Sequence, residues 1–481
     1  MRMTGLDGGV IDVDVGALEA RVAGDVLRPG GPGFAEATRI WNALAASTPA
    51  LVVRPRTAGD VREAVRFAAA HGVLLSIKGG GHNIGGTSLA PGGLTLDMSR
   101  MREVEVDPTR RLVRVGPGCL LGDVDRATQR HGLATVLGFV SETGVAGLTL
   151  GGGFGYLTRR FGWAVDNLEE VEIVTADGAI RRAAAGEHDD LFWAVRGGGG
   201  NFGVVTGFTF RLHPVGPDVV GGLIAWDAGQ IEAVLDRVRE VAAVAPRELT
   251  LGVTIRLGPP SYLLPAEWRG RPVIVVFACH TGDATAAAAD LAPLRRLGRP
   301  IADALGSIRY TAQQSLFDAT QPKGMCNVWR SEFLPGLPDG ALDVLAEHGP
   351  GMSAPLSQLA LMHLAGAIGE RDDGATAFGN RDAGWFFAAT ACWPPDRPEL
   401  AADRAWVEGA WAAMRPHSTG GNYVNAQAAD AGDDRLREAY RGGALERLAA
   451  IKAAYDPGNL FRVNRNIAPA PARTPVAAPG A

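Results

Sequence analysis

Three glycine-rich loops in the first half of this chain constrain its fold more than any other feature. They read KGGGHNIGG (78–86), TGVAGLTLGGGFG (143–155) and RGGGGNFG (196–203). Glycine has no Cβ, so its backbone can approach a ligand closely and adopt conformations that other residues avoid. Successive backbone N–H groups in such loops often form a concave anion site. A single loop of this kind is typical of a flexible turn, but three in one region favour a cradle for a diphosphate or a cofactor.

The third loop contains the pattern G-x-G-x-x-G at Gly198, Gly200 and Gly203. A dinucleotide-binding βαβ unit needs a strand before this pattern and a helix after it. Here the helix-like run DLFWAVR precedes the glycines, and the β-branched run VVTGFTF follows them. Because this order is reversed, the sequence does not predict a Rossmann fold.

Strands, helices and hairpins alternate over residues 51–211. A helix is predicted between Thr57, a suitable N-cap, and Gly72, a suitable terminator. Turn residues predict hairpins at Asp107-Pro108 and at Asp177-Gly178. This mixture favours an α+β fold class over a purely parallel sheet.

From about Pro214 the pattern changes to long alanine-rich helices, such as GQIEAVLDRVREVAAV and ADRAWVEGAWAAMRPH. They alternate with strand-like runs: LTLGVTIRL, PVIVVFACHTG, LSQLALMHLAGAIG and GWFFAATACW. We expect residues 215–420 to form one antiparallel sheet with helices on one face. The Pro- and Ala-rich tail, residues 469–481, is predicted to be disordered.

Composition excludes several classes of protein. The net charge is -5 over 481 residues, and no basic block is present, so no nucleic-acid partner is expected. No apolar run is long enough to span a bilayer, and the N-terminus lacks the apolar core of a signal peptide. The four cysteines are far apart, which predicts no metal site and favours free thiols in a reducing cytoplasm.

Four motifs carry a resemblance to a known family: IKGGGHNIGG, DNLEEVEIVTADG, DLFWAVRGGGGNFGVVTGFTF and YDPGNLFRVNRNI. In this order they resemble the FAD-linked oxidases of the berberine bridge enzyme type, within the vanillyl-alcohol-oxidase-like (PCMH-type) flavoproteins. The resemblance covers nearly the whole chain and is weakest over about 217–350. It implies an FAD-binding domain made of residues 1–214 and 421–468, with the substrate domain, residues 215–420, inserted between them.

The resemblance also implies a covalent bond from His82 to the 8α-methyl group of the flavin. A neutral imidazole nitrogen is a nucleophile, and the neighbouring glycines let the backbone close on the cofactor. Family members with two covalent links have a cysteine where this chain has Val140, in LGFVSETG. The nearest thiol, Cys119, lies in a different loop, so we expect FAD held by a single link.

Further cofactor contacts are implied for the glycine loops, their flanking residues and the C-terminal segment. For the two asparagines of RVNRNI, capping of a chain reversal is the alternative role. The full set is Ile77, Lys78, Gly79, Gly80, Gly81, His82, Asn83, Ile84, Gly118, Val140, Ser141, Thr143, Gly144, Gly147, Leu148, Thr149, Gly151, Gly152, Gly153, Gly155, Tyr156, Gly203, Val204, Val205, Tyr423, Asn425, Asn464 and Asn466.

On the substrate side, GGNYVNAQ resembles the family's Tyr-x-Asn motif, which assigns Tyr423 and Asn425 to the flavin. Two residues apart on an extended segment, they would point to one side. Many family members have a second tyrosine, often given the role of base, where this chain has Ala426. Tyr423 could act as the base only with a depressed pKa, since a free phenol titrates near ~10, and a nearby cation could supply that. The alternative is that Tyr423 only packs or hydrogen-bonds at the ring.

His363 and Gln358 are further catalytic candidates, on the strand-like run LSQLALMHLAGA. Strand alternation puts them on opposite faces, so only one of them can face the flavin. A histidine on an apolar strand is more often a structural core residue than a base.

The sequence therefore predicts an FAD-dependent oxidase that takes a hydride from a small organic substrate and passes electrons to O2, giving H2O2. Alcohols, sugars, amines and polyketide- or alkaloid-type metabolites remain open as substrates. The alternatives are a dehydrogenase or an oxidative cyclase with another acceptor, or a flavin-binding protein without redox turnover.

Overall fold

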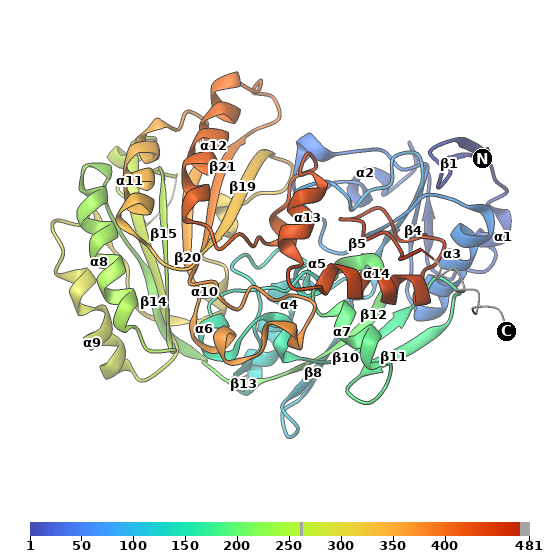
Figure 1. Ribbon diagram of the computed structural model, residues 1–481, viewed down its shortest axis with the longest axis horizontal. Coiled ribbons are helices and arrows are strands. Elements are labelled where there is room, and N and C mark those ends of the chain that lie inside the picture. Colours follow the sequence, from blue (N-terminus) through green and yellow to red (C-terminus); the bar gives the residue numbers. More distant parts are fainter. Residues whose placement is uncertain (260–262, 472–481) are drawn as a thin grey trace, which may run out of the picture.

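The computed structural model describes residues 1–259 and 263–471, which form two packed halves (Figure 1). The loop half contains residues 1–214 and 421–471, at the right of Figure 1, and the sheet half lies at the left. Most of the tail predicted to be disordered lies outside the described residues. The fold is mixed α and β, as the sequence predicts.

The first glycine loop follows a small sheet of the loop half. Its four described strands run in the order β3 (Asp25–Leu27), β4 (Leu51–Arg54), β6 (Leu94–Asp97) and β5 (Leu75–Lys78), with β4 and β5 parallel to β6. Helix α3 (Ala58–His71) joins β4 to β5 and is bounded as predicted. Thr57 accepts a hydrogen bond from the Asp60 amide at 3.2 Å, and Gly72 ends the helix with φ 62°. The chain thus leaves β5 directly into KGGGHNIGG.

A second sheet of the loop half is antiparallel. Its described strands run in the order β11 (Ile180–Ala184), β10 (Leu168–Val174), β12 (Val204–Arg211), β8 (Leu112–Val115) and β7 (Val104–Asp107). Both predicted hairpins are present. Helices α4 (Leu121–Thr128), α5 (Val145–Leu150) and α7 (Asp189–Val195) surround it, and α14 (Ala444–Tyr455) returns from the C-terminus to pack against α7 (Figure 1). Its residues Leu448 and Ile451 enter the same core as Trp193 and Phe202.

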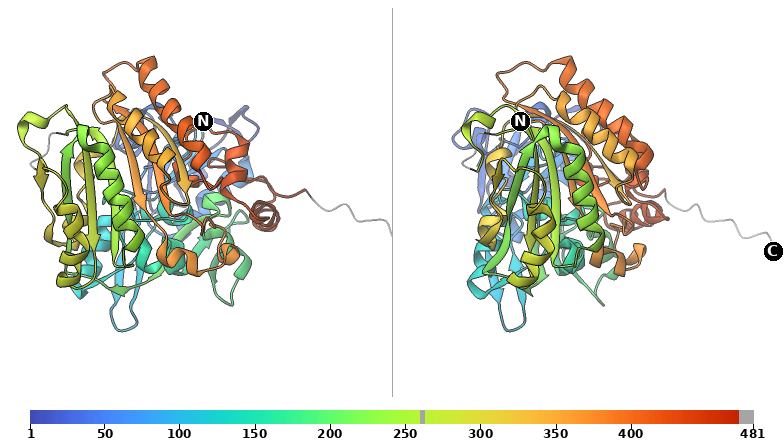
Figure 2. Two further views of the ribbon diagram at one scale, coloured as in Figure 1. Left: turned by 60° about the vertical axis from the view of Figure 1, so that its left-hand side comes forward. Right: turned by 90° about the vertical axis from the view of Figure 1, so that its left-hand side faces the viewer.

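The sheet half is built on one antiparallel sheet. The described strands run in the order β17 (Ala302–Asp303), β14 (Asp218–Asp227), β16 (Pro272–His280), β15 (Leu249–Leu257), β20 (Gln358–His363), β21 (Trp385–Trp393) and β19 (Cys326–Leu334), with β18 (Gly306–Arg309) beside β14. Helices α8 (Ile231–Val244), α9 (Ala284–Arg295), α11 (Asp339–His348) and α12 (Ala401–Met414) cover one face (Figure 2). The other face turns towards the loop half (Figure 1).

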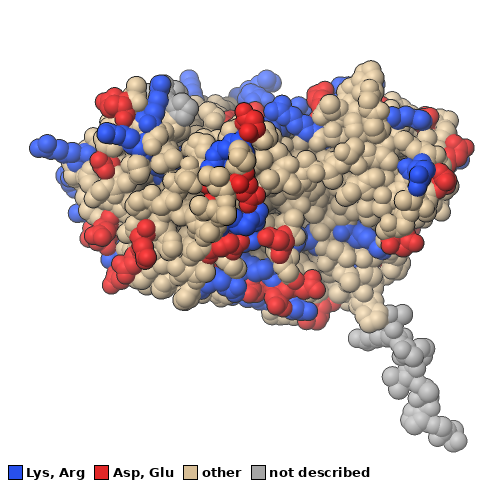
Figure 3. Space-filling view, turned by 90° about the horizontal axis from the view of Figure 1, so that it is seen from above, with Lys and Arg blue, Asp and Glu red and all other residues tan. Residues whose placement is uncertain are grey.

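The surface carries charges of both signs. On the face shown in Figure 3, basic and acidic side chains are interspersed over both halves. Among the described residues, no helix has the length and apolar composition needed to cross a membrane. All four cysteines are buried and free.

The two halves meet partly through α4 and helix α10 (Tyr310–Gln314). The Asp125 carboxyl group of α4 accepts a hydrogen bond from Gln314 Nε2 at 3.1 Å. Asp125 is fully buried, and this burial raises its pKa to about 7. The interface therefore contains a carboxyl group that is easily protonated.

We expect Asp125→Asn to flatten the pH dependence of stability. The folded-state pKa of about 7 lies above the ordinary 3.8, so the native state keeps a proton that the unfolded chain loses between these values. This contribution, of order 4 kcal/mol, is present at low pH and is lost as pH rises through about 7. The free energy of unfolding, measured with urea at about pH 5 and pH 8, should fall less between these two pH values for Asp125→Asn than for the wild type. The exposed carboxyl variant Glu232→Gln is the control, and equal decreases in all three proteins would contradict the assignment.

Candidate active site

The glycine loops and the C-terminal segment enclose one groove of about 1310 Å³, including the solvent at its mouth. We call it the glycine groove. It is lined by Ile77, Gly79–Ile84, Thr87, Ser88, Thr143, Gly144, Ala146–Leu148, Leu150, Gly198–Asn201, Tyr423–Asn425, Tyr440 and Val463–Arg465.

Backbone geometry in the groove fits a diphosphate-bearing cofactor. In the described parts of the chain, the amides of Gly80, Gly81 and His82 donate no hydrogen bond, so they are free to bind phosphate oxygens. A Cβ on Gly147 or Gly200 would meet no described protein atom within 4 Å, so both backbones face open space. The Asn464 Oδ1 atom, at the groove wall, is buried without a described partner. These features are what an FAD site requires.

Other glycines let the loops pack on each other. A Cβ on Gly80 would collide with the backbone of Gly144, in the second loop. We therefore expect Gly80→Ala to destabilise the protein itself. Gly147→Ala, the matched variant, should fold normally and retain less FAD, because its methyl group would occupy ligand space. Melting temperature and bound flavin check both. A destabilised Gly147→Ala with full flavin would contradict this division of roles.

His82 lies in the groove wall and stacks on Trp41, with 5.6 Å between ring centroids and 23° between planes. Its Nε2 atom is buried without a described hydrogen-bond partner. Burial, with a smaller effect from the Lys323 charge, lowers the pKa of His82 to about 3. The imidazole is therefore neutral at physiological pH, which is the nucleophilic form.

The position next to the groove offers no thiol. Val140 lines the neighbouring cavity, and its hydrocarbon side chain has no nucleophilic atom. Cys119 lines neither cavity. Its Sγ donates to the Glu103 carbonyl at 3.5 Å, and burial raises its pKa to about 12, so the thiol stays protonated.

Several residues assigned to the cofactor from the sequence do not line the groove. The Lys78 ammonium pairs with Asp97 at 3.2 Å, and Ser141 bonds to Asp318 of the sheet half. The later glycines of the second loop contact protein: a Cβ on Gly152 would meet Phe378. The predicted cofactor residues that do not line the glycine groove are Lys78, Gly118, Val140, Ser141, Thr149, Gly151, Gly152, Gly153, Gly155, Tyr156, Gly203, Val204, Val205 and Asn466. Cofactor contact of these residues stays a prediction from the sequence.

Conversely, the groove contains residues that the cofactor prediction did not include. In the third loop, Gly198–Asn201 face the groove, whereas Gly203 packs on β10. The glycines themselves were a visible signal, but the sequence does not indicate which end of the loop is exposed. Thr87, Tyr440 and Arg465 carried no such signal.

A second cavity of about 980 Å³, open solvent included, lies between the groove and the open face of the large sheet. We call it the aromatic cavity, because most of its wall is aromatic or apolar. It is lined by Trp41, His82, Ile84, Gly138–Val140, Thr143, Leu148, Phe154, Thr254, Phe317, Gln321, Trp329, Gln358, Met362, Phe386, Tyr423, Asn425 and Ala426. His82, Tyr423 and Asn425 line both cavities, so ligands in the two would meet at these residues.

Tyr423 and Asn425 share one side, as predicted, but for a different reason. Val424–Ala426 form a 3-10 turn and not an extended segment. Asn425 Nδ2 donates a hydrogen bond to the Tyr423 hydroxyl at 3.0 Å. Burial raises the pKa of Tyr423 to about 12, although the hydrogen bonds with the Asn425 side chain and the Gly153 backbone oppose the shift. The depressed pKa that a tyrosine base would need is therefore absent.

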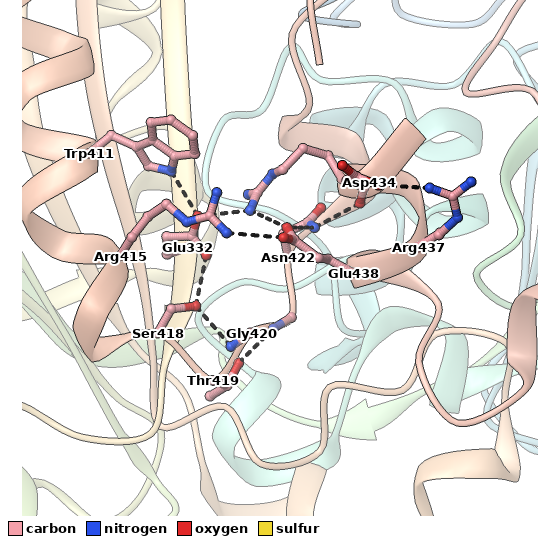
Figure 4. Close-up of polar contacts among 12 residues, drawn as sticks. Glu332, Trp411, Arg415, Ser418, Thr419, Gly420, Asn422, Asp434, Arg437 and Glu438 are labelled. Carbon is pink, nitrogen blue, oxygen red and sulfur yellow. Dashed lines mark hydrogen bonds and ion pairs between the residues drawn. The ribbon is translucent and has the colours of Figure 1, made fainter. Parts of the chain in front are cut away.

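A polar network holds the segment that leads to Tyr423 (Figure 4). Glu332 of β19 accepts hydrogen bonds from Trp411 Nε1 at 2.7 Å and from the Ser418 hydroxyl at 2.8 Å, and it pairs with Arg435 at 2.9 Å. Asn422 Nδ2 donates to the Arg435 carbonyl at 2.8 Å. Strand β19, helix α12 and helix α13 (Asp433–Ala439) thus fix the position of the neighbouring Tyr423.

Gln358 and His363 lie on opposite faces of β20, as strand alternation predicts. Gln358 lines the aromatic cavity. His363 does not: its Nε2 lies 2.8 Å from Arg159 Nη1, and its ring stacks on Trp385. Burial, assisted by the Arg159 charge, lowers the pKa of His363 to about 2. These contacts and the lowered pKa favour a structural role for His363 over the role of base.

Comparisons with known proteins agree with this geometry. A profile described as "FAD binding domain" matches residues 49–184, and one described as "Berberine and berberine like" matches residues 422–468. The chain is 30% identical to (R)-6-hydroxynicotine oxidase of Paenarthrobacter nicotinovorans, over 94% of this chain and 98% of the relative.

Solved structures share the fold. The structure of 6-hydroxy-D-nicotine oxidase from Arthrobacter nicotinovorans superposes with a TM-score of 0.82 at 28% identity, over 93% of this chain and 98% of that one. Glucooligosaccharide oxidase from Acremonium strictum, described with a 6-S-cysteinyl, 8α-N1-histidyl FAD, gives a TM-score of 0.82 at 24% identity, over 94% of this chain and 99% of that one. With the two cavities and the full-length relative, these findings show that the chain is an FAD-dependent oxidoreductase and belongs to the berberine bridge enzyme-like family of FAD-linked oxidases.

Proposed function

We propose that this protein is an oxidase, which removes a hydride from a small organic substrate and transfers the electrons to O2. The single observation that carries the proposal is the junction of the two cavities at His82, Tyr423 and Asn425. A substrate in the aromatic cavity would there contact a flavin held in the glycine groove. The named relatives, a hydroxynicotine oxidase and an oligosaccharide oxidase, are consistent with this arrangement.

We propose further that His82 holds FAD through one covalent bond. The buried Nε2 leaves Nδ1 as the accessible ring nitrogen of a neutral imidazole. The free amides of the first loop would bind the diphosphate, and the unpartnered Asn464 Oδ1 would accept a hydrogen bond at the groove wall. When bound, FAD supplies a two-electron acceptor that also reacts with O2. The substrate loses two electrons and two protons, and O2 gains them as H2O2.

Tyr423 would act as a hydrogen-bond donor and not as a base. Its oxygen accepts from Asn425, so its own proton is available to the substrate. No Asp, Glu or Lys side chain is among the described residues that line the aromatic cavity.

Two predictions about the whole chain remain proposals. We propose that the loop half and the sheet half are the FAD and substrate domains, divided near residues 214 and 420. We also propose a cytoplasmic location, because the four free cysteines suit a reducing compartment.

A substrate panel tests the proposed function. The yellow holoprotein is mixed anaerobically with alcohols, sugars, amines and aromatic acids, and its absorbance is followed. An oxidase should bleach with its substrate and recover colour in air while forming H2O2. Bleaching without recovery in air would indicate a dehydrogenase, and a cyclised product would indicate an oxidative cyclase. A protein that none of the compounds bleaches would contradict the proposal.

A further inference from the structure

The sheet wall of the aromatic cavity presents hydrogen-bond donors without matching acceptors. The Thr254 hydroxyl and the Trp329 indole N–H are buried and have no described partner. Both residues line the cavity together with Gln358. A buried donor without a partner is costly, so a wall of this kind suits a ligand that accepts hydrogen bonds.

Arg256 lies beside this wall, opposite Gln358 on the neighbouring strand. It is on β15, two residues beyond Thr254 and therefore on the same face of the sheet, and it is only 3% exposed. Its Nη1 is 3.5 Å from Gln358 Oε1, so the Gln358 amide is turned with its Nε2 donors away from Arg256. The Nε and Nη2 atoms of Arg256 are buried without a described partner.

The charge of Arg256 is not balanced inside the described chain. Arg256 forms no ion pair with a described residue, whereas the comparably buried Arg381 pairs with Asp166 at 2.6 Å. Arg159, also buried, donates to several backbone carbonyls. Burial lowers the pKa of Arg256 only to about 10, so it remains positive at neutral pH. A buried cation normally has an anionic partner.

We propose that the missing partner is the substrate: the aromatic cavity takes an organic anion with an aromatic or apolar body, such as an aromatic carboxylate, and the anionic oxygen binds at Gln358 and Thr254, beside Arg256. The body would lie among Trp41, Phe154 and Phe386. Gln358 is then a specificity residue, and Arg256 is a positioning residue that orients the Gln358 amide and supplies the positive field. This inference names the substrate class of the proposed oxidase and rests on that function.

Binding of a matched pair of probes tests it. Isothermal titration of the holoprotein compares trans-cinnamate with cinnamamide, which have the same body and differ in charge. Charged hydrogen bonds are the stronger ones, so the wild type should bind cinnamate about tenfold or more tightly than cinnamamide. Arg256→Met should remove this preference, while Arg256→Lys, which retains the charge, should keep part of it. The exposed Arg299→Met variant, which loses the same charge in the same half, should behave like the wild type.

The outcomes separate this inference from the oxidase proposal, because binding is measured without turnover. Equal wild-type affinities for the two probes, or binding of neither at millimolar concentration, would overturn it even if a neutral substrate were oxidised. An Arg256→Met variant that keeps the preference would also overturn it. If Arg256→Met does not fold, the inference is still tested by the affinities of the wild type and of Arg256→Lys for the two probes. Binding that follows the expected pattern would stand even if O2 proved not to be the acceptor.

Discussion

Replacing His82 by alanine should remove all flavin that survives denaturation on the polypeptide. Alanine has no nucleophilic atom, and in the described structure no other reactive side chain takes the place of the imidazole: Val140 is inert, and Cys119 is a buried thiol with a raised pKa outside both cavities. After acid precipitation, the wild-type protein should give a fluorescent band on a gel and His82→Ala should give none. Any FAD that His82→Ala binds should be released into the supernatant.

The control for this experiment is His131→Ala, at an exposed position on the surface of the loop half. It should keep the fluorescent band, because it removes an imidazole without touching the groove. A fluorescent band in His82→Ala would show that another residue forms the link.

Replacing Tyr423 by phenylalanine should slow flavin reduction by substrate by roughly 10- to 100-fold, the effect of losing a hydrogen bond of about 1.5–3 kcal/mol. The flavin content should not change, because His82 and the glycine loops are untouched. Stopped-flow mixing without O2 measures the rate. Tyr455→Phe, at the end of α14 and outside both cavities, is the matched control and should reduce at the wild-type rate.

The pH dependence of this effect separates a donor from a base. With a pKa of about 12, the Tyr423 phenol stays protonated at neutral and mildly alkaline pH. The ratio of wild-type to Tyr423→Phe rates should therefore be constant between about pH 6 and pH 9. If Tyr423 acted as a base, the ratio would rise about tenfold per pH unit, because the tyrosinate fraction rises in that way below the pKa. An unaltered rate in Tyr423→Phe would exclude both roles.

Local signals in the sequence predicted much of the fold. Helix α3 has its cap at Thr57 and its terminator at Gly72, and both hairpins turn where Asp-Pro and Asp-Gly stand. Strands β14 and β19 were not predicted. In β14, Gly221 and Gly222 interrupt the apolar pattern of the sequence but not the strand. Strand β19 carries Glu332, which is stable there only because Trp411, Ser418 and Arg435 bond to it. Such partners come from distant segments and leave no local pattern.

The site was predicted in outline but not in detail. The glycine loops, His82, Tyr423 and Gln358 carry recognisable chemistry, and the structure brings them to the two cavities. The pKa values and the contacts of the site residues depend on burial, which cannot be read from the sequence. It raises the pKa of Tyr423 where a depressed value was considered, and it places the later glycines of the second loop against protein.

The central claim is that one bond from His82 tethers FAD where the two cavities meet. Proteolytic digestion of the acid-denatured wild-type protein, followed by mass spectrometry of every flavin-bearing peptide, tests it most directly. We expect flavin on the peptide that contains His82 and on no other. An unmodified His82 peptide with free FAD in the supernatant, or flavin attached to the Cys119 peptide, would contradict the claim.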